Sequence, residues 1–108
     1  MNIKQQAFYE ARAKIFKALA HPTRLFILDE LMKQERCVNE LTQMVGADTS
    51  TVSKHLSILK NARVVQDEKR GAQVYYHIKM PCTVNFFHCV EDALQTDIRE
   101  RMNSIIKD

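Results

Sequence analysis

The chain has 108 residues, a formal net charge of +3, 27% charged side chains and 45% hydrophobic ones. This length accommodates one domain, and the low content of glycine and proline, two of each, argues against a disordered or collagen-like chain. No apolar run approaches the ~18 residues of a membrane-spanning helix, and the N-terminal segment has no apolar stretch of the signal-peptide kind. We therefore expect one domain over residues 1–108, in the cytoplasm and without a membrane partner.

The basic side chains are unevenly distributed along the chain. Residues 47–79 carry an excess of basic side chains, whereas residues 80–108 carry more acidic than basic ones. An anionic partner such as a nucleic acid would therefore bind the middle of the chain rather than its C-terminal segment.

Two helices are predicted in the first third of the chain. Over residues 5–20, apolar side chains recur at steps of three and four, as on one face of a helix: Phe8, Ala11, Ile15 and Leu19. Pro22 suits the first turn of a second helix, because its missing N–H has no partner within the helix there. This helix should end near Gln34 and bury Leu25, Leu28 and Leu31 or Met32.

A short helix, a tight turn and another helix follow. The short helix places Val38, Leu41 and Val45 on one face. Gly46 closes it, since glycine accepts the left-handed conformation of a helix C-terminus. Asp48 or Thr49 then provides an N-cap for a helix over about 49–62. The buried stripe of that helix comprises Val52, Leu56 and Leu59. This succession is a helix-turn-helix pattern.

The apolar period then changes from helical to two, which predicts a β-hairpin over about 64–79. Val64 and Val65 open a short strand, and a second strand alternates Val74, Tyr76 and Ile78 with polar or half-polar residues. Residues 69–72 form the turn, in which Gly71 is free to take a positive φ. The turn is basic, with Lys69 and Arg70 at its tip.

A long helix is predicted over about 82–106. A helix of about 25 residues is about 37 Å long, which exceeds the ~26 Å diameter of a domain of this size. Its apolar stripe either packs on its own core or, as we favour, pairs with a twin helix across a two-fold axis, together with the helix over 5–20. The candidate interface residues are Phe8, Ile15, Phe87, Val90, Leu94, Ile98, Met102 and Ile105.

The face of the 49–62 helix opposite its buried stripe is small, rich in hydroxyl groups and basic. Such a face can enter a DNA major groove closely. A merely solvated helix would more often carry pairs of Glu and Lys. Basic residues at the hairpin tip could reach flanking phosphates or a minor groove. The candidate DNA-contacting residues are Thr49, Ser50, Thr51, Ser53, Lys54, His55, Ser57, Lys69 and Arg70.

Three segments together resemble the ArsR/SmtB family of dimeric winged-helix repressors. They are residues 19–25 (LAHPTRL), residues 49–56 (TSTVSKHL), and residues 69–71 with 74–76. The resemblance covers about residues 10–95. It implies a mainly α winged helix-turn-helix fold with a small β-hairpin and a long C-terminal dimerisation helix. It also implies a homodimer that represses transcription on operator DNA and releases it when an effector binds. This chain departs from the family where it has His21 rather than Asp, Thr49 rather than Gln, and Ala72 rather than Arg.

The candidate ligands of the effector are three cysteines, Cys37, Cys82 and Cys89. An odd number without an export signal predicts reduced thiols. Three thiolates suit trivalent arsenic, antimony or a soft metal ion as inducer. Because Cys82 and Cys89 would lie about 10.5 Å apart along one helix, they can share an ion only if Cys82 precedes the helix or comes from the partner subunit.

Several alternatives remain open from the sequence. The family's arsenic sensors often carry Cys-Val-Cys at the start of the third helix, where this chain has Asn39 in place of the second cysteine. The cysteines could instead form a redox-sensing disulfide, or be buried without a sensing role. The whole domain could be a winged-helix protein-interaction module that binds no DNA. We expect neither an enzyme nor a required cofactor.

Overall fold

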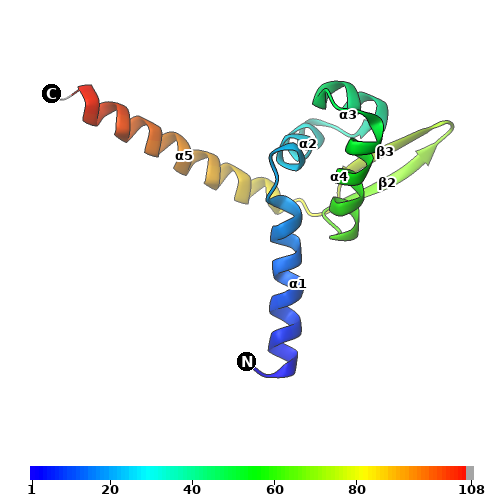
Figure 1. Ribbon diagram of the computed structural model, residues 1–108, viewed down its shortest axis with the longest axis horizontal. Helices are drawn as coiled ribbons and strands as arrows, with labels where there is room; N and C mark the ends of the chain where they lie inside the picture. Colours follow the sequence, from blue (N-terminus) through cyan, green and yellow to red (C-terminus); the bar gives the residue numbers. More distant parts are fainter. Residues whose placement is uncertain (107–108) are drawn as a thin grey trace.

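Residues 1–106, which the computed structural model describes, form five α-helices and three β-strands (Figure 1). The helices are α1 (Ile3–Leu19), α2 (Pro22–Lys33), α3 (Val38–Val45), α4 (Thr49–Asn61) and α5 (Thr83–Ile106). The strands are β1 (Arg36–Cys37), β2 (Val65–Arg70) and β3 (Gln73–Ile78). The expected helix-turn-helix is α3 and α4, and the wing is the hairpin of β2 and β3. The predicted fold class, a winged helix-turn-helix with a long C-terminal helix, is confirmed.

The turn between α3 and α4 follows from two short-range signals. Gly46 ends α3 with a left-handed φ of 77°, which glycine adopts without a steric penalty. Asp48 caps α4, because its Oδ1 accepts the backbone N–H of Thr51 at 2.7 Å. The hydroxyl of Thr51, its backbone N–H and the Ser50 hydroxyl, in that order of effect, lower the pKa of the Asp48 carboxyl. The predicted cap and turn therefore fix where the second helix of the motif begins.

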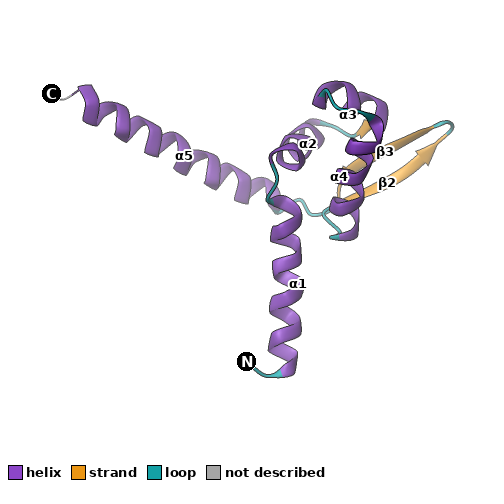
Figure 2. Cartoon of the chain, viewed as in Figure 1, coloured by secondary structure: helices purple, strands orange, loops and turns teal. Residues whose placement is uncertain are grey.

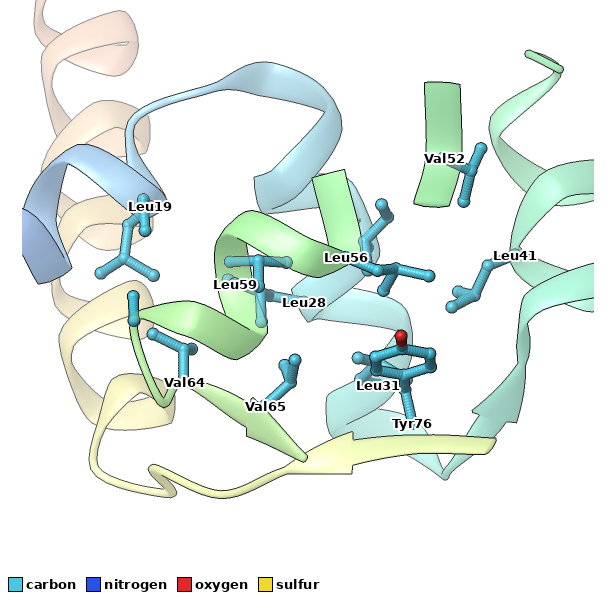
Figure 3. Close-up of a cluster of buried hydrophobic side chains, with 13 residues drawn as sticks. Leu19, Leu28, Leu31, Leu41, Val52, Leu56, Leu59, Val64, Val65 and Tyr76 are labelled. Carbon is cyan, nitrogen blue, oxygen red and sulfur yellow. The ribbon is translucent and has the colours of Figure 1, made fainter. Parts of the chain in front are cut away.

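The core lies between α2, α3, α4 and the wing (Figure 3). The fully buried side chains are Ile27, Leu28, Leu41, Val52, Leu56, Leu59, Val64 and Val65. All three residues of the predicted α4 stripe are among them. The prediction that Leu25 is buried is wrong: it is 39% exposed, because α2 turns Ile27, Leu28 and Leu31 toward the core instead.

The sheet has three antiparallel strands in the order β1–β3–β2. The sequence does not predict β1, because two residues are too few to show an alternation of apolar and polar side chains. In this strand Arg36 pairs with Tyr76 of β3. The turn of the wing is shorter than the predicted 69–72, because Arg70 still pairs with Gln73 within the ladder. Gly71 carries the positive φ, 62°.

Helices α1 and α5 project from this body, which gives the chain principal extents of 60 × 45 × 22 Å (Figures 1 and 2). α1 covers nearly the predicted range of 5–20. α5 begins at Thr83, whose hydroxyl donates to the Met80 carbonyl at 2.8 Å, so Cys82 precedes the helix. None of the helices within residues 1–106 is long and apolar enough to span a membrane.

Candidate nucleic-acid interface

The outer face of α4 presents the residue types expected for a major groove. Thr49, Ser50, Thr51, Lys54 and Ser57 are all exposed, and Ser53 is half-buried. Lys54 is in none of the ion pairs formed within residues 1–106. The face thus combines small hydroxyl groups, which allow close approach, with a lysine that forms no ion pair in the part of the chain that the structure describes.

α4 is capped at its start and tied to β2 at its end. At its start Asp48 caps the helix, and at its end the Lys60 ammonium donates to Asp67 of β2 at 2.9 Å. This ion pair raises the pKa of Lys60. A helix fixed in this way loses little conformational freedom on binding.

His55 lies apart from the other candidate residues of α4. It is half-buried, and its Nδ1 lies 3.2 Å from the guanidinium of Arg24. Arg24 also donates from Nε to the Ala18 carbonyl at 2.7 Å, so it ties the start of α2 to the end of α1. The structure therefore turns His55 toward the α1–α2 junction rather than toward the exposed hydroxyl face.

The two basic residues of the wing differ in their surroundings. Lys69 is exposed and is in none of the ion pairs of the described chain. The Arg70 guanidinium is paired with Glu35, at 3.0 Å from Nη2 to Oε2, and with Glu68 at 2.9 Å. It also lies 4.8 Å from the ring centre of Tyr75. The pKa of Glu35 is lowered and that of Arg70 raised by this pair, so any phosphate contact by Arg70 competes with two carboxylates.

A further bridge beneath the wing was not apparent in the sequence. Arg36 of β1 pairs with Glu30 at 3.1 Å and with Glu40 at 3.8 Å, which ties α2, β1 and α3 together. Asn39 of α3 donates to Gln73 of β3 at 3.3 Å. These contacts orient the wing relative to α3, and no local motif signals them.

The three cysteines are not brought together in one chain. Cys37 is 6% exposed and precedes α3, whereas Cys82 and Cys89 are exposed near the start of α5. Within the described residues no three His, Cys, Asp or Glu side chains are placed to hold a metal ion. The predicted three-thiolate site is therefore not assembled within a single subunit.

The predicted interface residues divide into two groups. Ile15 and Phe87 are partly buried against the core. The others are exposed, by 42–77% on α5 and by 61% at the remaining position on α1. We call these the exposed apolar face: Phe8, Val90, Leu94, Ile98, Met102 and Ile105. A groove of about 520 Å³ adjoins it between α1, α2 and α5, with Phe16, Leu25 and Phe86 among its walls.

Comparison with known proteins identifies relatives with this fold. Residues 21–67 match the family described as bacterial regulatory protein, arsR family. The crystal structure of Rv0081 from Mycobacterium tuberculosis is 32% identical, with a TM-score of 0.78 over 88% of this chain and 96% of that one. The solution structure of a Mycobacterium bovis fragment of Mb0332, a homodimeric winged helix-turn-helix DNA-binding domain, is 28% identical, with a TM-score of 0.81 over 93% of each chain.

A named repressor is also among the relatives. The transcriptional repressor SmtB of Mycobacterium tuberculosis is 39% identical over 79% of this chain and 61% of its own length. The expectation of a regulator rather than an enzyme is confirmed by these proteins. This chain belongs to the ArsR/SmtB family of DNA-binding transcriptional regulators, which have a winged helix-turn-helix fold.

Proposed function

We propose that the chain is a homodimeric repressor in which α4 of each subunit enters the major groove of operator DNA. The observation that carries this proposal is the exposed face of α4, with its hydroxyl groups and with Lys54, which forms no ion pair within residues 1–106, on a helix that is capped at its start and tied to β2 at its end. Ser50, Thr51 and Ser57 would contact bases or phosphates, and Lys69 of the wing would contact the flanking backbone.

The exposed apolar face supports the dimer. Soluble monomers rarely leave an apolar patch of this kind uncovered. Leu94 and Ile98 are 59% and 57% exposed, and they follow one another at helical spacing along α5. Pairing with the same face of a second copy would cover both helices and place two α4 helices in successive major grooves, about 34 Å apart.

Lys54→Ala tests the DNA-binding part. We expect it to weaken operator binding at least tenfold and to lower the slope of log affinity against log salt by about 1 per subunit. Lys33→Ala is the matched control, since Lys33 is an exposed lysine of α2, is paired with Glu30 and does not lie on α4. Fluorescence anisotropy at several salt concentrations measures both. Equal losses in the two variants would contradict the assignment of α4 as the reading helix.

We further propose a thiophilic effector, trivalent arsenic or antimony or a soft metal ion, that acts at α5. The support is the position of Cys82 and Cys89, which are exposed next to the apolar face. Because one subunit does not gather three ligands, the site would draw thiolates from both subunits. A bound ion would then alter the pairing of α5 and, with it, the spacing of the two α4 helices.

Arsenite titrated into the operator complex under reductant tests this effector. We expect arsenite to release operator DNA from the unmodified protein and from Cys37→Ser. We expect no release from Cys82→Ser or from Cys89→Ser. Release by an oxidant alone, reversed by reductant, would assign the thiols to redox sensing instead. A complex that ignores both treatments would refute the role of these cysteines as sensors.

A further inference from the structure

Two histidines from distant parts of the chain meet beside α4. His21 is the N-cap residue of α2, and His55 lies on the inner edge of α4. Their ring centres are 4.5 Å apart, with an angle of 44° between the rings. Arg24 joins the same cluster, at 3.2 Å from Nη1 to His55 Nδ1. Beside the buried apolar packing of α4 on α1 and α2, this cluster is a polar contact between the recognition helix and the α1–α2 junction.

The hydrogen bonds require both histidines to be unprotonated at Nδ1. An arginine side chain only donates, so His55 Nδ1 accepts from Arg24. His21 Nδ1 accepts from the backbone N–H of Thr23 at 3.1 Å, which is the cap of α2. A proton added at either Nδ1 would remove the acceptor and break the bond.

The charges around His55 also oppose its protonation. Burial lowers the pKa of the His55 imidazole, and His21 and Arg24 lower it further. These two side chains come from α2 and its N-cap, and Lys54 is the neighbour of His55 on α4 itself. A depressed histidine pKa means that the open or unfolded form binds protons more readily. The closed cluster is therefore stable above the ordinary pKa of 6.5 and weakens as the pH falls through that value.

We propose that Arg24 and His21 are positioning residues, which hold α4 in its DNA-binding orientation only while His55 is neutral. This proposal rests on the proposed DNA-binding function. Acidification would then release operator DNA. A protonated histidine on a DNA-binding face would do the opposite, because an added cation strengthens phosphate binding. The direction of the pH dependence thus separates a positioning role of His55 from a direct DNA contact.

Operator affinity measured by anisotropy between pH 7.5 and 5.5, at constant ionic strength, tests the proposal. One histidine per subunit, with an ordinary pKa of 6.5 in the open form, limits the loss to about tenfold for each subunit over this interval, and so to about a hundredfold for the dimer. His55→Asn keeps an acceptor near Nδ1 but does not titrate, so its affinity should change much less. His88→Asn, on α5, is the matched control and should retain the loss seen in the unmodified protein.

A nuclear magnetic resonance titration of the His55 ring tests the cluster without DNA. We expect a midpoint below 6.5, and a higher midpoint in His21→Asp, which keeps an N-cap acceptor but replaces a neighbouring base with an anion. A midpoint above 6.5 in the unmodified protein would overturn the proposal, as would operator binding that tightens on acidification. Absence of DNA binding at every pH, with the expected midpoint intact, would instead refute the proposed function and leave the cluster in place.

Discussion

Arg63 closes α4 in a conformation that usually belongs to glycine. Its φ is 62°, the one positive φ found outside glycine in residues 1–106. The N–H of Arg63 donates to the Lys60 carbonyl at 2.9 Å, and that of Val64 donates to the Leu59 carbonyl at 3.0 Å. These two bonds form a Schellman motif, whose left-handed position favours glycine. The joint between the recognition helix and the wing is therefore conformationally strained.

Arg63→Gly should relieve this strain and stabilise the fold. The left-handed conformation costs a residue with a Cβ about 1–2 kcal/mol. Glycine also lowers the free energy of unfolding by about 0.5–1 kcal/mol, because it gives the unfolded chain more conformational freedom. We therefore expect the free energy of unfolding to rise by about 0.5–1 kcal/mol per chain.

Urea denaturation at equal protein concentrations measures the change. Gly46→Ala is the converse variant. Gly46 has a φ of 77°, and no atom lies within 4 Å of a Cβ built there, so the stability lost in this variant reports conformational effects without a steric clash. We expect that variant to lose about 1 kcal/mol. An Arg63→Gly protein that is less stable than the unmodified one would refute the reasoning, because the Arg63 side chain would then stabilise the joint by more than the strain.

The exposed apolar face and the wing give two further predictions. Leu94→Glu should yield a folded monomer at micromolar concentration, as measured by sedimentation. Gln95→Glu, which adds the same charge one residue away, should remain dimeric. A dimeric Leu94→Glu protein would contradict the proposed interface. Lys69→Ala should lower the salt slope of operator binding by about 1 per wing, and Arg70→Ala should lower it by less, because Arg70 is paired with Glu35 and Glu68. Glu35→Gln should raise operator affinity because it frees Arg70 from a bidentate pair. An equal rise in the Arg70→Ala background would show that Glu35 acts on the DNA directly.

The elements with strong local signals were predictable from the sequence. The α4 stripe of Val52, Leu56 and Leu59 has helical period and lies entirely in the core. Gly46 and Asp48 mark the turn of the motif through conformation and capping, which depend on neighbouring residues only. Such signals require no knowledge of the rest of the chain.

What the sequence did not predict depends on contacts between distant residues. The pair of Arg70 with Glu35 joins positions 35 residues apart, and the contact between Arg24 and His55 joins positions 31 apart. Leu25 is apolar and in helical register with Leu28, yet it is exposed because neighbouring helices, and not its own periodicity, decide which face of α2 is covered. The cysteines differ in burial for the same reason.

In the proposed function, α4 distinguishes an operator from other DNA. The most direct measurement compares the affinity of the dimer for the DNA upstream of its own gene with its affinity for a scrambled duplex of equal length, at one salt concentration. We expect the upstream DNA to bind at least about 10³-fold more tightly. Equal affinities would contradict sequence reading by α4, and no salt-dependent binding to either duplex would identify the domain as a protein-interaction module instead.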